Sequence, residues 1–246
     1  MRVLALDTTT RAGSVALLDG ERIVEERAGD GARTHAERLP AEITSLIESH
    51  HLTLADIDLY AVGSGPGSFT GLRIGIATIQ GLALVHGRRI APISALEAIG
   101  HLCAAGAAPG TLVGAWMDAH RREVFSALYR ISHALPFSAE HLQELEGPTV
   151  GDPAATLARW ASQNTPPAVF GGDGAGLYAE TIARAAPAAR LVPPTLLAGA
   201  IGRLAHAREP HGIDPGAMRP LYVRRPDAEI ARDEKLRAVE TDHKAH

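Results

Sequence analysis

The chain has 246 residues, of which 46% are hydrophobic and 21% charged, and its formal net charge is −4. This composition is ordinary for a soluble globular protein and excludes wholesale disorder. A protein that grips a nucleic-acid backbone by itself usually carries a basic domain or stripe. None is visible in the sequence, so direct RNA binding by this chain alone is not expected.

Two further observations bear on location. No uninterrupted apolar run approaches the roughly 18 residues that a membrane span needs. The N-terminus reaches the carboxylate of Asp7 too soon for a secretory signal. We therefore expect a cytoplasmic protein.

The start of the chain predicts three antiparallel strands followed by a helix. Asp19-Gly20 is a strong hairpin signal between the second and third strands. Thr34 and Glu37 form a capping box that predicts the start of the helix. Pro40 is awkward inside that helix, so we expect either a kink or a regular part that begins near Leu39. The strands are predicted at 3–6, 14–18 and 21–26.

The next elements alternate between strand and helix patterns, and the second half of the chain restarts with a strand pair. Strands are predicted at 59–63, 89–93, 111–118, 123–129 and 168–170. Helices are predicted at 69–85, 95–107, 153–163, 175–186 and 196–207, before an extended segment at 220–224.

This order of elements predicts an α/β protein with two lobes. The Gly/Pro/Ala stretch 106–110 is the expected boundary between a first lobe, 1–105, and a second lobe, 106–225. The helix 196–207 is expected to pack back on the first lobe. The charged segment 226–246 lacks apolar periodicity and is predicted to be a flexible tail.

The cysteine and histidine residues give little support for a catalytic thiol or a metal site. The single cysteine, Cys103, lies in an apolar run and is predicted to be a buried, inert thiol. Twelve histidines are present, but no His-Glu-x-x-His and no pair at i and i+4 occurs. We therefore predict no metal site and no cofactor.

The segment from Gly65 to Gly75 is the most informative motif in the sequence. It joins a strand to a helix, where backbone amides and the helix dipole favour an anion. It matches neither the Walker A loop, the dinucleotide fingerprint nor Gly-x-Ser-x-Gly. A tight turn whose glycines let another helix approach closely is favoured over phosphate binding.

A second candidate site follows the first strand. Asp7, Thr8 and Thr9 could bind a nucleotide by cradling a phosphate and a hydrated metal, or they could satisfy the amides of their own turn. The sequence leaves both interpretations open. Asp118 follows the first strand of the second half and occupies a comparable place.

Several of these motifs together resemble the TsaB (YeaZ) family of glycoprotease-like proteins, over about residues 1–225. The Gly65 to Gly75 string is the most specific of them. The others are Leu6-Asp7-Thr8-Thr9 with the hairpin, Thr34 to Leu39, Ser94 to Ala98, Met117 to Ala119, Arg122 to Phe125, Gly172 to Gly174 and Pro220 to Arg224.

The resemblance implies a two-lobed, actin-like (ASKHA, RNase H-like) fold with mixed sheets flanked by helices. It also implies a non-catalytic scaffold subunit for making threonylcarbamoyladenosine (t6A) at position 37 of ANN-decoding tRNAs. Its implied partners are a catalytic TsaD-like paralogue and a TsaE-like P-loop ATPase, with tRNA bound only through the complex. A homodimer is conceivable when the chain is alone.

The resemblance also implies which residues matter. The metal-binding histidines of the catalytic paralogue correspond here to Ala95 and Ile99, which have no lone pair to offer. Helices around 35–49 and 69–85 are expected to form the pairing bundle. The partner-interface candidates are His35, Leu39, Phe69, Leu72, Arg73 and Ile76. The alternatives are a metal-dependent glycoprotease-type peptidase and a small ASKHA kinase that uses Asp7.

Overall fold

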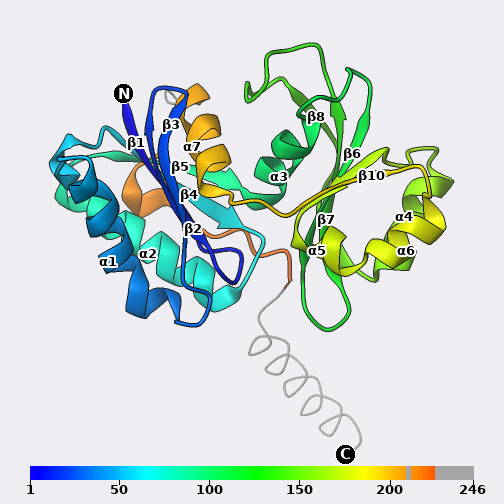
Figure 1. The fold of residues 1–246 in the computed structure, drawn as a ribbon, viewed down its shortest axis with the longest axis horizontal. Coiled ribbons are helices and arrows are strands. Elements are labelled where there is room, and N and C mark those ends of the chain that lie inside the picture. Colours follow the sequence, from blue (N-terminus) through cyan, green and yellow to red (C-terminus); the bar gives the residue numbers. More distant parts are fainter. Residues whose placement is uncertain (209–211, 225–246) are drawn as a thin grey trace, which may run out of the picture.

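A computed structural model describes residues 1–208 and 212–224; the predicted tail at 226–246 lies outside the described residues. The chain forms two five-stranded sheets, each flanked by helices (Figure 1). This is the α/β, mixed-sheet class that the sequence predicted. In this part of the chain, no helix is both long and apolar enough to cross a membrane.

The first sheet has the strand order β3-β2-β1-β4-β5. The hairpin predicted at Asp19-Gly20 is confirmed, because β2 and β3 pair antiparallel around it and Gly20 has φ +59°. β4 and β5 run parallel to β1. The strands are β1 (Arg2–Asp7), β2 (Ser14–Asp19), β3 (Arg22–Ala28), β4 (Leu59–Gly65) and β5 (Arg89–Ser94).

The second sheet has the order β10-β9-β6-β7-β8. The sequence did not predict β8 or β10, which are the two edge strands. β8 contains two glutamates and Pro148 and lacks regular apolar alternation, features that an edge strand tolerates. The strands are β6 (Leu112–Asp118), β7 (Val124–Ile131), β8 (Leu142–Gly151), β9 (Val169–Gly171) and β10 (Arg190–Val192).

The first two helices cover one face of the first sheet. α1 (His35–Ser49) begins directly after Thr34, whose backbone N–H donates to Glu37, and continues through Pro40. Of the two alternatives for Pro40, the later start near Leu39 is therefore wrong. α2 (Phe69–Val85) has the predicted bounds. Leu4 and Leu6 of β1 point into the core beneath these helices, whereas Val3 and Ala5 point to the opposite face, as strand periodicity requires.

The remaining helices belong to the opposite face and to the second sheet. The predicted helix at 175–186 is divided at Tyr178, whose φ of −108° and ψ of 27° leave the helical range. The helices are α3 (Ala95–Ala104), α4 (Pro153–Ser162), α5 (Asp173–Leu177), α6 (Ala179–Ala185) and α7 (Ala198–Ala207), with short 3₁₀ turns at Leu54–Asp56 and Pro215–Ala217.

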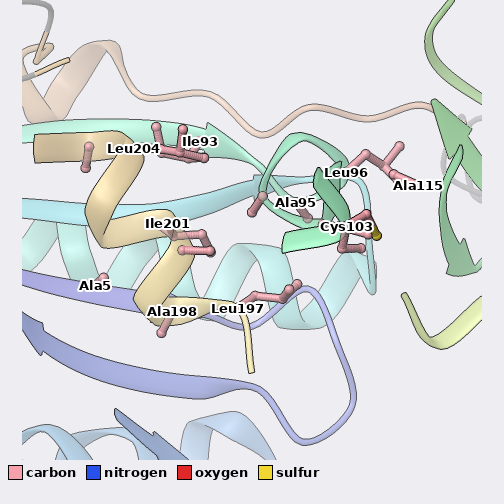
Figure 2. Packing of buried hydrophobic residues seen from close by; sticks show 14 of the residues in the cluster. Ala5, Ile93, Ala95, Leu96, Cys103, Ala115, Leu197, Ala198, Ile201 and Leu204 are labelled. Carbon is pink, nitrogen blue, oxygen red and sulfur yellow. The ribbon is translucent and has the colours of Figure 1, made fainter. Parts of the chain in front are cut away.

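A core of small side chains lies between the two sheets, built around α3 and α7. α7 packs on β1, β2 and β4, while α3 contacts β6 and β9 of the second sheet. Cys103 is 1% exposed, and burial raises the pKa of its thiol to about 12. The predicted burial of this cysteine is confirmed. Figure 2 labels members of this core: Ala5, Ile93, Ala95, Leu96, Cys103, Ala115, Leu197, Ala198, Ile201 and Leu204.

Candidate functional site

A cleft of about 1130 Å³ lies where loops of both sheets meet the N-terminal end of α2. Its walls come from segments that are far apart in the sequence. The β1–β2 loop and α2 belong to the first sheet, and the β6–β7 turn belongs to the second (Figure 1). The lining segments are 9–11, 31–35, 66–72, 117–121, Phe125, Asp173 and 221–224, together with Ile74.

One side of α2, which we call its inner face, is formed by Gly71 and Gly75 and is continued by Gly67 just before the helix. A Cβ atom built on Gly67 would lie 2.6 Å from the carbonyl oxygen of Thr9, and one on Gly71 or Gly75 would lie closer still to Thr8. The glycines therefore admit the β1–β2 loop directly against the helix. The packing interpretation of the motif fits this geometry, but the segment that approaches is mainly a loop rather than a second helix.

The β1–β2 loop is held by the carboxylate of Asp7, which is 1% exposed. Its Oδ1 accepts hydrogen bonds from the backbone N–H and the hydroxyl of Thr9, at 2.8 and 2.6 Å. Its Oδ2 accepts from the hydroxyl of Thr10 at 2.6 Å. Both oxygens of Asp7 thus have partners within the turn, as the second of the two open interpretations requires. Thr8 is fully buried against Gly75.

Two aspartates, Asp118 at the end of β6 and Asp173 at the start of α5, line the same cleft. Asp118 accepts a hydrogen bond from the backbone N–H of His120, and its other oxygen lies 3.2 Å from the His120 ring. Asp173 accepts from the backbone N–H groups of Asp118 and Gly174. Burial, followed by the charges of Asp118 and Asp7, raises the pKa of Asp173. Within residues 1–208 and 212–224, no three His, Cys, Asp or Glu side chains are grouped to hold a metal.

The predicted partner-interface residues divide into a buried group and a group that is half-buried or exposed. The second group is His35, Phe69 and Arg73. Leu39, Leu72 and Ile76 are 1%, 1% and 5% exposed. Their side chains are buried within this chain, which favours a packing role over an interface role for these three residues. Helical spacing identifies an apolar stripe but not what covers it.

His35 at the start of α1 is half-buried between Arg38 and the inner face of α2. Its Nδ1 accepts a hydrogen bond from Arg38 at 2.7 Å, and its ring lies beside Gly71. Burial and then the Arg38 charge lower the pKa of His35 below its ordinary value of 6.5. Arg38 also donates to the carbonyl of Ala12. His35 therefore belongs to the packing that joins α1, α2 and the β1–β2 loop.

Comparison with known proteins identifies the family to which this chain belongs. A model of the TsaD family, described as tRNA N6-adenosine threonylcarbamoyltransferase, matches residues 27–162, more than half of the chain. TsaB of Haemophilus influenzae, named as a tRNA threonylcarbamoyladenosine biosynthesis protein, is 44% identical over 101 residues, which are 40% of this chain and 42% of that one. The chain belongs to the TsaD family, and within it resembles the TsaB (YeaZ) proteins.

The similarity to solved structures extends over most of the chain. YeaZ from Pseudomonas aeruginosa superposes with a TM-score of 0.70 at 26% identity, covering 90% of this chain and 99% of that one. An uncharacterized protein of Mycobacterium tuberculosis is 37% identical over 132 residues, which are 52% of this chain. That match spans 58% of the relative, little more than half of its length. The resemblance to the TsaB family is thereby confirmed.

The positions of the catalytic histidines implied by that resemblance lie in α3, away from solvent. Ala95 and Ile99 are 0% and 3% exposed and belong to the core between the sheets. A Cβ atom on Gly172 would lie 3.1 Å from Ile99, so little free space adjoins this side chain. In this TsaB-type chain, apolar packing occupies these positions.

Sequence reasoning missed a cluster at the mouth of the cleft, formed by Phe69, Arg73 and Tyr222. The rings of Phe69 and Tyr222 stack with centroids 5.2 Å apart, and the Arg73 guanidinium lies 4.0 Å from the Phe69 centroid. The Arg73 Nε donates to the Tyr222 hydroxyl at 3.1 Å. Phe69 and Arg73 were predicted as partner-interface residues, but their contact with Tyr222 was not, because Arg73 and Tyr222 are 149 residues apart.

The outer face of α2, formed by Ala77, Gly81 and Leu84, lies opposite the glycines of the inner face. All three residues are exposed, and the Leu84 side chain reaches 63%. Apart from the chain neighbours of Gly81 and the nearby backbone of α2 itself, no atom of the described residues lies within 4 Å of a Cβ built on Gly81. The outer face is therefore open, narrow and apolar.

Proposed function

We propose that this chain is a non-catalytic scaffold subunit required for t6A formation at position 37 of ANN-decoding tRNAs. It acts by pairing with a catalytic TsaD-like paralogue and by helping that pair recruit a TsaE-like ATPase. Similarity to TsaB proteins supports a role in t6A formation, because these relatives are named as tRNA threonylcarbamoyladenosine biosynthesis proteins. The aliphatic residues at Ala95 and Ile99 support a non-catalytic role.

The composition of α2 is the observation that carries the pairing proposal. The helix has 17 residues, and Arg73 is its one charged residue. A surface helix normally places charged side chains on its solvent side. Here the outer face offers Ala77, Gly81 and Leu84 instead, and Val85 beside it is 80% exposed. An uncovered apolar helix face favours a protein partner.

The small residues of the outer face also indicate the kind of partner. Ala77 and Gly81 leave a shallow groove along the helix, into which the side chains of a second helix can pack at close range. A paralogue with the same fold presents a corresponding helix in the same place. A second copy of this chain presents one as well, so homodimers are expected when the paralogue is absent.

The test uses Gly81→Arg in the full chain. No side chain of the described residues is displaced by this change, so the monomer should keep its fold, whereas a helix packed at Gly81 would clash with it. Ala161→Arg, an equal charge on the exposed side of α4, is the matched control. We expect Gly81→Arg to weaken complex formation with a TsaD-like protein at least tenfold and to lower tRNA threonylcarbamoylation accordingly.

Sedimentation of the mixed proteins gives the affinity, and a tRNA modification assay gives the activity. Unchanged pairing by Gly81→Arg would remove α2 from the interface. Full modification in the absence of this chain, or threonylcarbamoyl transfer by this chain alone, would contradict the scaffold role itself.

A further inference from the structure

The cleft concentrates positive charge in a chain whose net charge is negative. Four arginines line it, Arg11, Arg33, Arg121 and Arg224, of which Arg224 is ion-paired with Glu123, together with two histidines. The acidic residues in its lining are Asp118 and Asp173, and each already accepts hydrogen bonds from backbone N–H groups. The cleft is therefore a local basic surface that the net charge of −4 conceals.

The exposed aromatic surface of the chain lies at the same place. All ten aromatic residues fall within the described ranges. Two of them, Phe69 and Tyr222, are exposed, each at 38%, and these two stack on each other at the mouth of the cleft. Because Arg73 holds both rings, the cluster is an ordered platform rather than a pair of independent side chains.

The β6–β7 turn that faces this platform has an unusual backbone. His120, Arg121 and Arg122 have φ of 56°, 54° and 64°, the left-handed region that residues with a Cβ rarely adopt in succession. Arg224 holds the turn by donating to the carbonyl of Ala119 and to the carboxylate of Glu123. Such a maintained conformation points to a functional surface.

We propose that the mouth of this cleft binds a single-stranded RNA segment, with Arg11 and Arg33 contacting phosphates and the Phe69–Tyr222 pair stacking against a base. Single-stranded RNA offers this combination of regularly spaced phosphates and unpaired bases, and proteins that bind it pair a positive groove with aromatic side chains. The inference rests on the proposed function, since it gives this chain its own contact with the tRNA of the complex.

Three features of the site favour RNA over a protein partner. The positive charges of the lining are arginines, whose planar guanidinium pairs with phosphate through two hydrogen bonds. The N-terminal end of α2, including Ser68 and Thr70, lines the cleft and adds a favourable dipole for anions. The volume of about 1130 Å³ lies above the usual range for a small-molecule pocket, which leaves room for more than one nucleotide.

The test measures fluorescence anisotropy of a labelled anticodon stem–loop RNA on the full chain over a salt series. The variant Arg11→Gln/Arg33→Gln removes two phosphate contacts, and Tyr222→Ala removes half of the stacking platform. Arg184→Gln, on the exposed side of α6, is the matched control. Circular dichroism confirms that each variant is folded.

We expect the double variant to weaken binding about tenfold and to lower the slope of log K against log salt by about 1.4, since each phosphate contact on a single strand contributes about 0.7. Tyr222→Ala should weaken binding by a similar factor with an unchanged slope. Arg184→Gln should bind like the unaltered chain. A duplex RNA of equal length should bind more weakly than the stem–loop.

Three outcomes would overturn the proposal. The first is equal RNA affinity in all variants. The second is displacement of the RNA by AMP at matching concentration, which would identify a mononucleotide pocket. The third is a loss of pairing with a TsaD-like protein, at unchanged RNA affinity, in Tyr222→Ala, which would identify a protein-docking surface.

The complex separates this inference from the proposed function. If the pair forms and modifies tRNA while the cleft variants keep full RNA affinity, the RNA site is wrong and the scaffold role stands. If Gly81→Arg leaves pairing intact and modification does not need this chain, the scaffold role is wrong whatever the RNA measurements show.

Discussion

The inner and outer faces of α2 both contain glycine, yet the chain uses them in opposite ways. On the inner face, Thr8 of the β1–β2 loop occupies the space beside Gly71 and Gly75. On the outer face, Gly81 meets no atom of the described chain. The glycines on the two faces of this helix therefore have different structural roles. One face closes the fold of the chain, and the other is left open for a partner.

The largest expected effect is on stability, and it comes from comparing two variants that each place one carboxylate on α2, one at a buried position and one on the outer face. Leu72→Glu buries an unpaired charge in the core and should destabilise the chain by about 3–5 kcal/mol. Ala77→Glu on the outer face should change stability by less than about 0.5 kcal/mol. Urea unfolding of both variants measures the difference. A stable Leu72→Glu monomer that fails to pair would restore Leu72 to the interface.

A smaller effect is expected from Gly75→Ala. The added methyl group would overlap the Thr8 side chain, and overpacking of this kind costs about 1–3 kcal/mol. Thr8→Ala removes the atoms that clash, so the double variant Thr8→Ala/Gly75→Ala should lose less than the sum of the two single changes. Thermal unfolding of the four proteins in this cycle gives the coupling. Additive losses would show that Thr8 does not fill the space beside Gly75.

The same substitution at Gly81, about two turns further along α2, is expected to raise stability rather than lower it. Gly81→Ala meets no neighbour and replaces a poor helix former by the best one, so it should stabilise the isolated chain by about 0.5–1 kcal/mol. Differential scanning calorimetry on the isolated chain is the appropriate measurement. A destabilised Gly81→Ala monomer would mean that the outer face is already occupied within the chain.

The smallest effect concerns pH and the inner face. The pKa of His35 is lowered in the folded chain, chiefly by burial, so the unfolded chain binds the proton more readily. Stability contributed by neutral His35 should be present above its ordinary pKa of 6.5 and be lost as pH falls below that value toward the folded pKa. His35→Gln should reduce the fall in melting temperature between pH 7.5 and 5.5. An unchanged fall would show that His35 is solvated.

Much of the fold could be predicted from local signals. The bounds of α2 and the hairpin at Asp19-Gly20 are as expected, because periodicity and turn chemistry are encoded within a few residues. β8 was missed because an edge strand needs little apolar alternation. The predicted helix at 175–186 is broken at Tyr178, where the preceding Gly174 and Gly176 weaken helical continuity.

The candidate site was harder to predict than the fold. The apolar stripe of α2 was visible in the sequence, but its division between core and interface was not, and Leu72 and Ile76 lie in the core. The absence of a basic stripe in the sequence argued against RNA binding by this chain. In the structure, arginines from separate loops, including Arg11 and Arg33, converge on one cleft.

The sequence by itself determined the family, most of the elements of the first sheet, and the apolar positions of Ala95 and Ile99. Each of these depends on residue identity or on short-range spacing. The tertiary structure decided which face of α2 is filled, and it brought Phe69 and Tyr222 into contact. Burial and long-range contact depend on how the whole chain packs, and no local pattern records which segments will meet across a fold.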